Sequence, residues 1–359
     1  MKSERIIGFD LARGLAIIGM IIVNFKVVMS IESNNAYYTI MNLFTGKAAA
    51  LFVILAGAGL SLMYQLALKK ETTEALRKLK VDVLKRSLFL FVIGLSYYPI
   101  WPADILHYYG VYLSVATLML AWSKKRLVVL SIILILLYPF LLVSLDYSKG
   151  WNFETLEYLD FFTLYGFIRN LIFNGFHPVI PWITFLLTGI WVGRINFNNE
   201  KILLKMAAYS AIIYFVFKLG SVMLLSVDSA VYGLSINDAA ALFSTAPMPP
   251  NAFYMYTASA LAVFVISVCV LIGKKMANTL LVRSLVSFGQ LALSNYFFHV
   301  IIGMFGLAIV FNNLENAFST KFVFWYSISY SLVFIVFSHQ WRKRFNRGPI
   351  EALMRKITG

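Results

Sequence analysis

The sequence contains little charge and only one cysteine. Charged residues make up 13% of its 359 residues, whereas an average soluble domain contains about 25%. With a hydrophobic content of 60%, too few charged side chains remain to cover the water-facing surface of a soluble protein. The 31 Phe and 20 Tyr exclude a disordered chain, and the single Cys269 excludes a disulfide framework and a cysteine metal site. The composition therefore predicts a polytopic membrane protein.

Long apolar runs indicate the membrane spans. A bilayer core about 30 Å thick needs roughly 20 apolar residues per helix, and these runs lack the alternation of barrel strands. Ten segments are long enough: 6–29, 46–67, 84–101, 104–122, 127–145, 179–195, 202–225, 253–273, 285–311 and 319–339. The predicted fold class is an all-α, polytopic bundle of about ten transmembrane helices, forming a single transmembrane domain over residues 1–359.

The basic residues are distributed unevenly along the chain. Of the 31 Lys and Arg residues, 24 lie in the N-terminus, which includes Lys2, and in segments 69–86, 124–126, 194–205, 274–283 and the tail 340–359. Because cytoplasmic loops of membrane proteins are enriched in Lys and Arg, both termini are expected in the cytoplasm and the long loops 146–178 and 226–252 outside. The net charge of +15 then reflects topology, and nucleic acid is not an expected partner. The basic tail is expected to lie against anionic lipid headgroups.

Two charged residues interrupt the first apolar segment. Asp10 and Arg13 are three residues apart, so a helix places them on one face, close enough to pair. They also argue for a retained first span rather than a cleaved signal peptide. Two interpretations stay open: a structural ion pair that fixes this span in the bundle, or a polar site at its inner end where Arg13 meets an anionic cofactor.

Three of the four histidines are expected near the outer face. His107 lies one turn from Asp104, His177 lies just before the outer start of the segment 179–195, and His299 lies in the outer half of 285–311. The topology also places Asn24, Asp104 and Lys47 at this depth. Histidine takes up and returns a proton near neutral pH, although each of these alone is also typical of an interfacial hydrogen-bonding residue. A metal site is not expected, since the histidines show no short ligand spacing.

Four stretches carry a resemblance to a known family. RIIGFDLARGLAIIGMIIVNF resembles the first span of membrane-bound acyltransferases, which opens with R-x-x-x-x-D-x-x-R-G. The stretches TGKAAALFVILAGAGLSL, HPVIPWITFLLTGIWVGR and SFGQLALSNYFFH are similar to later motifs in the same order. Together they resemble the bacterial relatives of heparan-α-glucosaminide N-acetyltransferase, including the YeiB-like group.

The resemblance implies transfer of an acyl group, most simply acetyl, from cytoplasmic acyl-CoA to a sugar hydroxyl or amine at the outer face. The expected location is the plasma membrane, or the inner membrane of a Gram-negative source. The broader acyltransferase family has a histidine eleven positions after the RG arginine, where this chain has Asn24, and the following loop contains no histidine. The resemblance therefore implies a base among the outer histidines. The candidate catalytic residues are His299 as first choice, His177, His107 and Asn24, and the candidate cofactor-binding residues are Asp10, Arg13 and Lys47.

Two other functions stay open at this stage. A transporter or lipid translocator on the same scaffold would use Asp10, Arg13 and the outer histidines as coupling groups, but inverted repeats and paired broken helices are not visible in the sequence. A non-catalytic scaffold or receptor is the third hypothesis. The expected partners are membrane lipid, acyl-CoA and a glycan or amine acceptor, with a homodimer as a further candidate. The aromatic loop 146–178 is expected to lie on the membrane surface or to cap a cavity.

Overall fold

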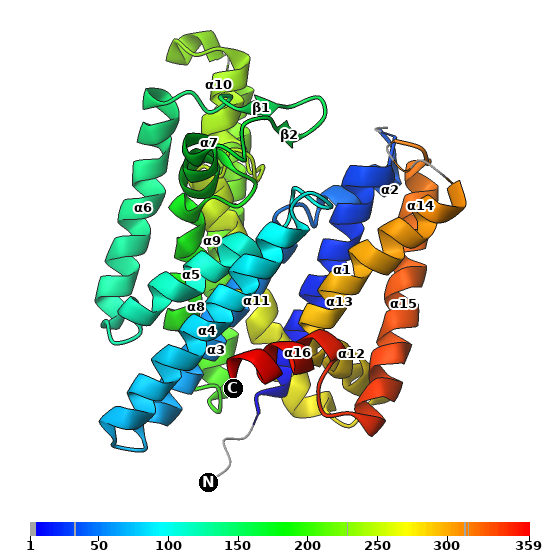
Figure 1. Ribbon diagram of the computed structural model, residues 1–359. Coiled ribbons are helices and arrows are strands. Elements are labelled where there is room, and N and C mark those ends of the chain that lie inside the picture. The colour runs from blue at the N-terminus through cyan, green and yellow to red at the C-terminus, as the bar shows by residue number, and fades with distance from the viewer. Residues whose placement is uncertain (1–4, 32–33, 228, 312–313, 315) are drawn as a thin grey trace. The chain divides into compact units, whose positions relative to one another are not determined.

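The computed structural model describes residues 5–31, 34–227, 229–311, 314 and 316–359. Lys2, one of the residues used to predict the topology, lies outside this described part. The described chain is built of helices, joined by loops that include a short antiparallel hairpin of β1 (Trp151–Asn152) and β2 (Glu157–Tyr158) (Figure 1). The predicted helical architecture is confirmed.

Seven helices in the described part of the chain are long and apolar enough to cross a membrane: Ile7–Met29, Ala36–Leu68, Lys124–Ser144, Glu200–Ser226, Ala252–Met276, Ala292–Phe311 and Thr320–Arg344. The pair Leu164–Asn174 and Val179–Val192, bent by 47°, makes eight if it is one broken span. The predicted segments 84–101 and 104–122 fall on α4 (Thr73–Tyr97), whose first half is basic, and on α5 (Leu106–Met119), which has only 14 residues. The count of about ten spans and the sides of the termini stay predictions.

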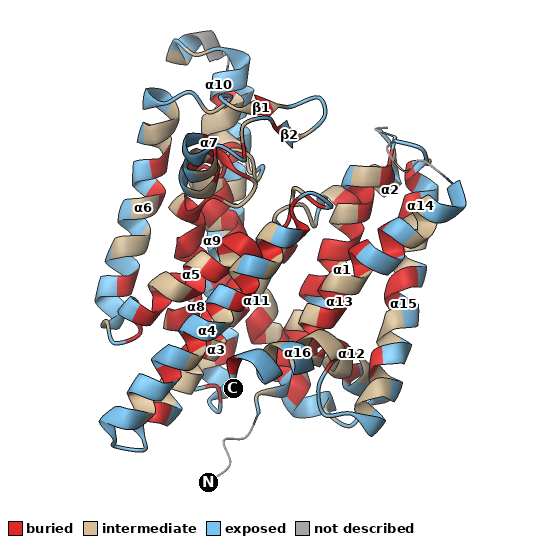
Figure 2. Ribbon diagram, in the orientation of Figure 1, coloured by how far each residue is buried: buried red, intermediate tan, exposed pale blue. Residues whose placement is uncertain are grey.

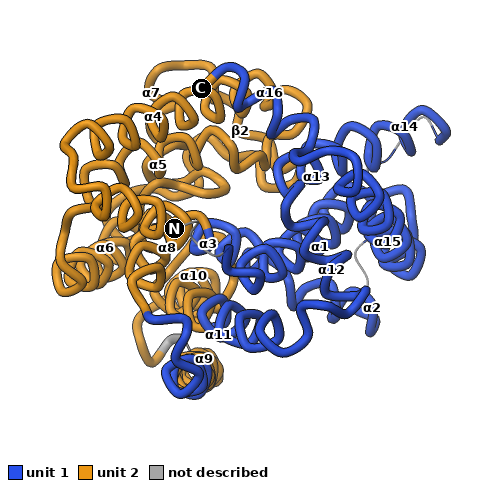
Figure 3. Tube along the Cα trace, turned by 90° about the horizontal axis from the view of Figure 1, so that it is seen from below, with its two compact units in different colours: residues 1–55, 196–208, 261–357 blue, residues 56–195, 209–260, 358–359 orange. Residues whose placement is uncertain are grey.

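The chain forms two compact units (Figure 3). Unit 1 contains residues 1–55, 196–208 and 261–357, and unit 2 contains residues 56–195, 209–260 and 358–359. Helices α3 (Lys47–Leu68), α9 (Glu200–Ser226) and α11 (Ala252–Met276) contribute residues to both. A single transmembrane domain over the whole chain stays a prediction.

Unit 1 is organised around α1 (Ile7–Met29), which packs against α12 (Leu280–Gln290), α13 (Ala292–Phe298) and α15 (Thr320–Arg344). Its remaining elements are α2 (Ala36–Asn42), the π-helix η3 (His299–Met304), α14 (Phe305–Phe311) and α16 (Pro349–Thr358) up to residue 357. Glycines allow α1 and α12 to approach closely. A Cβ atom on Gly289 would collide with the carbonyl oxygen of Asp10, and one on Gly14 would lie 2.7 Å from the carbonyl oxygen of Leu285.

Gly289→Ala is expected to destabilise unit 1. The added methyl group has backbone atoms of α1 in its place, so the two helices must separate, at a cost of about 1–3 kcal/mol. Thermal unfolding of the detergent-purified protein measures the effect. Gly306→Ala is the matched control, because nothing lies within 4 Å of its Cβ position; equal unfolding temperatures for the two variants would contradict the tight α1–α12 contact.

Unit 2 contains the pair α4 and α5, and α8 (Val179–Val192), which packs against both α5 and α6 (Lys124–Ser144). Its other elements are α7 (Leu164–Arg169), the π-helix η1 (Asn170–Asn174), the 3-10 helix η2 (Ser229–Tyr232) and α10 (Ile236–Phe243). Only 17% of the apolar window of α6 and 11% of that of α9 is buried, and α6 presents a largely exposed or half-exposed surface in Figure 2. Exposed apolar helix faces of this kind are expected where a helix contacts lipid.

The loop 146–178 of unit 2 contains a compact aromatic cluster. Tyr98 stacks on Phe161 with ring centroids 3.5 Å apart, and both pack with Trp151 and Tyr158. Burial raises the pKa of the Tyr158 phenol, although the hydrogen bond that Arg169 donates to its oxygen opposes this shift. Elsewhere in the same loop Tyr165 is 84% exposed, as an aromatic side chain at a membrane surface would be.

Candidate functional site

A histidine and an amide meet in the interior of unit 1. Asn24 on α1 and His299 at the start of η3 are 275 positions apart in sequence, yet Asn24 Nδ2 lies 2.8 Å from His299 Nε2. His299 is fully buried, whereas Asn24 is half-buried. The structure thus brings together two of the four predicted catalytic residues.

The second ring nitrogen of His299 defines which atom can accept a proton. His299 Nδ1 is hydrogen-bonded to the carbonyl oxygen of Tyr296. A carbonyl can only accept, so Nδ1 carries the hydrogen. In the neutral imidazole Nε2 is then the acceptor, and the amide of Asn24 donates to it. A carbonyl that holds one ring nitrogen also fixes the ring orientation and leaves the other nitrogen as the acceptor.

Aromatic side chains and an irregular helix surround this pair. Phe25, next to Asn24 on α1, stacks on Tyr326 with ring centroids 5.2 Å apart and lies 6.2 Å from the imidazole ring. Gly303 leaves room for Phe25, because a Cβ atom there would collide with the Phe25 ring, and its carbonyl oxygen accepts a hydrogen bond of 2.7 Å from the Tyr326 hydroxyl. His299 itself begins the π-helix η3. Single turns of π-helix occur frequently at functional sites.

The other end of α1 carries a buried carboxylate with several donors. Asp10 is 2% exposed and accepts hydrogen bonds from Arg5 Nε at 2.5 Å, from Arg13 Nη1 at 2.8 Å and from Gln290 Nε2 at 3.4 Å. The predicted Asp10–Arg13 pair is therefore present, and the structure adds Arg5 and Gln290 to it. Arg5 lies before the helix begins, so helical spacing alone could not identify it as a partner.

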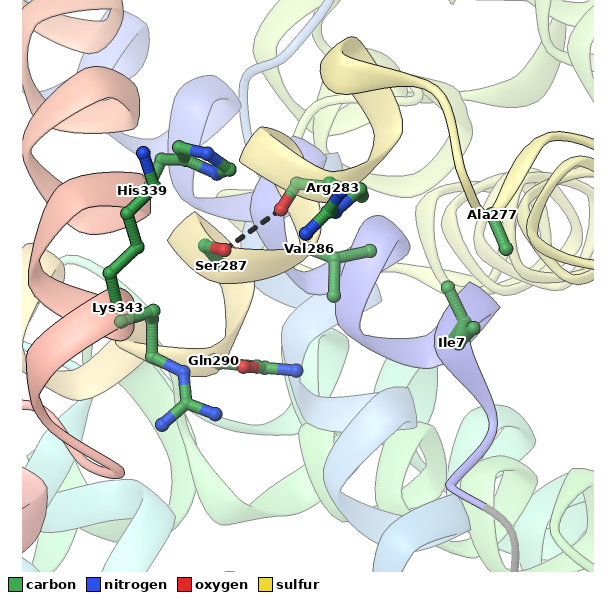
Figure 4. Close-up of a pocket in the computed structure, with 9 residues that line it drawn as sticks. Ile7, Ala277, Arg283, Val286, Ser287, Gln290, His339 and Lys343 are labelled. Carbon is green, nitrogen blue, oxygen red and sulfur yellow. Dashed lines mark hydrogen bonds between the residues drawn. The ribbon is translucent and has the colours of Figure 1, made fainter.

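A cationic cavity of about 410 Å³ lies at this end of unit 1, and Figure 4 shows the side chains that line it. It is lined by Ile7, Ala277, Arg283, Val286, Ser287, Gln290, His339, Arg342 and Lys343. The lining includes three basic side chains and no acidic one, and Gln290 connects it to Asp10. Arg and Lys side chains that lie close together are groups that bind phosphate oxygens.

The predicted cofactor-binding residues do not line this cavity. Asp10 is bonded to the arginines as described, and Arg13 contacts it from the same helix. Lys47 begins α3 and lies outside the residues that form the cavity. The sequence offers one signal for the cavity, since His339, Arg342 and Lys343 lie at positions that share a helix face. Topology alone also accounts for basic residues in this tail, so the signal is weak.

The other two predicted histidines lie in unit 2. His107 is fully buried, its Nδ1 lies 3.7 Å from a carboxylate oxygen of Asp104, and neither ring nitrogen has a hydrogen-bond partner among the described residues. His177 is near Tyr108, with ring centroids 5.8 Å apart, and its carbonyl oxygen accepts a hydrogen bond from Tyr112. The sequence-based proximity of Asp104 and His107 is confirmed. Whether these residues act together with His299 stays a prediction.

The long apolar helices and the polar groups within them define a multi-pass membrane protein. Residues 5–227 match the family model described as the catalytic region of heparan-alpha-glucosaminide N-acetyltransferase, and residues 196–359 match the model described as a protein of unknown function (DUF418). Among curated proteins no match was found. The first match covers more than half of the chain, so the protein belongs to the family of the heparan-alpha-glucosaminide N-acetyltransferase catalytic region, as its motifs predicted.

Membership makes this chain a membrane protein of the acyltransferase type. The polar residues of unit 1 come from both matched regions of the sequence. Asp10 and Asn24 lie in the first, whereas Arg283, His299 and Arg342 lie in the second. Both regions therefore contribute to the polar groups of unit 1.

Proposed function

We propose that the protein transfers an acyl group, most simply acetyl, from acyl-CoA to a sugar hydroxyl or an amine. The Asn24–His299 pair is the observation that carries the proposal, since it supplies a buried base with one fixed tautomer. The family supports the same reaction type. The chain would act as a multi-pass protein of about ten spans in the plasma membrane, or in the inner membrane of a Gram-negative source.

The cationic cavity fits the phosphates of the donor. With both termini in the cytoplasm, the start of α1 and the cavity beside it face the cytoplasmic acyl-CoA. Arg283, Arg342 and Lys343 would pair with the phosphate oxygens. Asp10 and Asn24 are fourteen residues apart on one continuous helix, or about 21 Å. A donor held at the cavity therefore needs a long flexible arm to bring its thioester to His299, and the pantetheine of CoA is such an arm.

The reaction uses the two ring nitrogens of His299, with Nε2 as the proton acceptor and Nδ1 held by the Tyr296 carbonyl. The acceptor hydroxyl or amine replaces the Asn24 amide at Nε2 and gives its proton to that nitrogen as its oxygen or nitrogen attacks the thioester carbonyl carbon. The C–S bond then breaks, and the proton passes from His299 to the departing CoA thiolate. The Tyr296 carbonyl stabilises the transient imidazolium through Nδ1. The Asn24 amide, once displaced, can donate to the carbonyl oxygen of the thioester.

Membranes that contain the protein test this function. Radiolabelled acetyl-CoA is supplied with glucosamine or with a glycan mixture, and labelled product is measured against membranes without the protein. Acetyl-CoA is also expected to raise the thermal stability of the purified protein. If the membranes form no labelled product and acetyl-CoA does not stabilise the purified protein, the proposal is contradicted. Uptake of labelled acceptor into vesicles without acyl-CoA would instead support a transporter.

Arg342→Glu is expected to weaken donor binding specifically. The substitution places a negative charge in the cavity lining, so the KM for acetyl-CoA should rise at least about tenfold through lost charge-assisted hydrogen bonds. The kcat at saturating donor should change little. Arg344→Glu is the control, because Arg344 is exposed on the same helix and does not line the cavity. An equal rise of KM in both variants would indicate a general charge effect rather than a binding site.

A further inference from the structure

The helix that carries His299 begins at a break in the chain. Leu291 has φ −101° and ψ 31°, which ends α12 and separates it from α13. The first N–H groups of a new helix have no partner within that helix. Those of Leu293 and Ser294 therefore need an acceptor from elsewhere, although the break lies within the predicted apolar segment 285–311.

A carboxylate from the C-terminal helix supplies this acceptor. Glu351 Oε1 accepts hydrogen bonds from the backbone N–H of Leu293 at 2.8 Å and of Ser294 at 3.2 Å, and Oε2 accepts from the Ser294 hydroxyl. The backbone N–H of Ile350 donates in turn to the Ser294 hydroxyl oxygen at 3.0 Å. Four hydrogen bonds thus join α16 to the first turn of α13, fifty-six to fifty-eight positions away in sequence.

The chain before Glu351 holds it in place. Gly348 lies against both the Glu351 carboxylate and the Ser294 hydroxyl, where a Cβ atom would collide with the carboxylate. The Trp341 indole donates to the carbonyl oxygen of Arg347 at 2.9 Å and so closes the turn between α15 and α16. Figure 1 shows α16 beside the ends of α12 and α13 that meet at this break. The C-terminal helix is therefore fixed against α13 by several hydrogen bonds.

We propose that Glu351 is a positioning residue for His299. Ser294 is five residues before His299, within the single short helix that leads into η3. By fixing the first turn of this helix, Glu351 sets the rotation and height of the imidazole relative to Asn24. The C-terminal helix thereby controls the geometry of the base. This inference rests on the proposed role of His299 in acyl transfer.

Two measurements on Glu351→Ala test the inference. Without substrate, modification of His299 by diethyl pyrocarbonate is followed by mass spectrometry. The imidazole is buried and hydrogen-bonded at both ring nitrogens, so it should react slowly in the natural protein and at least about tenfold faster in the variant. In the transfer assay, kcat should fall about tenfold because the base is misplaced, while the KM for acetyl-CoA stays within about twofold, since the cavity is intact.

Matched variants separate positioning from general damage. Glu351→Gln keeps an acceptor oxygen for the two N–H groups and should restore most of both readouts. Arg355→Gln, an exposed position on the same helix, should change neither. If Glu351→Ala does not fold, Ser294→Ala removes only the hydroxyl contacts and should shift both readouts in the same direction, less strongly.

Unchanged labelling and unchanged kcat in folded Glu351→Ala would overturn the inference. So would a rise in KM with constant kcat. If the natural protein shows no acyl transfer at all, the proposed function fails, whereas the labelling of His299 still decides whether Glu351 positions it.

Discussion

His299→Gln is expected to lower kcat for acyl transfer by about 10²–10⁴-fold, the usual contribution of a general base. Glutamine can still accept the hydrogen bond that Asn24 donates to His299 Nε2, but its amide cannot take up a proton at neutral pH. The KM for acetyl-CoA should stay nearly constant, because the cationic cavity lies at the other end of α1. The measurement is transfer of radiolabelled acetyl to the acceptor, with thermal unfolding as the check on folding.

A double-mutant cycle with Asn24 makes this expectation sharper. Asn24→Ala alone should cost about tenfold in kcat, equivalent to one lost hydrogen bond to the reacting group. In the His299→Gln background it should cost almost nothing, because the two residues act as one unit. Additive losses would show that Asn24 and His299 act separately. Activity of His299→Gln near that of the natural protein would move the base to His107 or His177.

Asp10→Ala is expected to destabilise the protein by about 2–3 kcal/mol. The variant loses a 2% exposed carboxylate with three donors and leaves the half-buried Arg13 without its partner. Arg5 is 59% exposed, so solvent screens its share of the interaction and Arg5→Ala should cost less than about 1 kcal/mol. Thermal unfolding of the two variants in the same detergent measures the difference.

The same pair of variants decides between the two interpretations of the Asp10–Arg13 pair. If the pair is structural, Asp10→Ala lowers the unfolding temperature, while the KM for acetyl-CoA stays unchanged in the folded fraction. If the pair belongs to a donor site, KM rises even where stability is restored by lower temperature. Equal stability of Asp10→Ala and Arg5→Ala would show that the carboxylate does not fix α1 against α12.

The sequence predicted the helical architecture well, because long apolar runs are a strong local signal. It predicted the Asp10–Arg13 contact too, since both residues lie on one helix face. It was weaker where a helix extends beyond its apolar part. α4 begins at Thr73, eleven residues before the predicted segment, because basic residues are good helix formers that hydropathy ignores.

Contacts between segments that are distant in sequence could not be predicted from the sequence. Asn24 and His299 were placed at one depth by counting residues, but only packing brings Nδ2 and Nε2 within 2.8 Å. The apolar segment 285–311 contained no sign of the break at Leu291 or of the π-helix at His299. Glu351 appeared as one acid in a basic tail, and its contact with α13 depends on the turn that precedes it.

The complete burial of His299 bears on how much acyl-CoA is lost to hydrolysis when no acceptor is bound. Water is the competing nucleophile for any thioester, and a general base that reaches bulk solvent activates water as readily as it activates an alcohol or an amine. Here the His299 ring is fully buried and its Nε2 is already hydrogen-bonded to the Asn24 amide. An enzyme with this arrangement should hydrolyse its thioester slowly when no acceptor is bound, so that turnover waits for the correct acceptor.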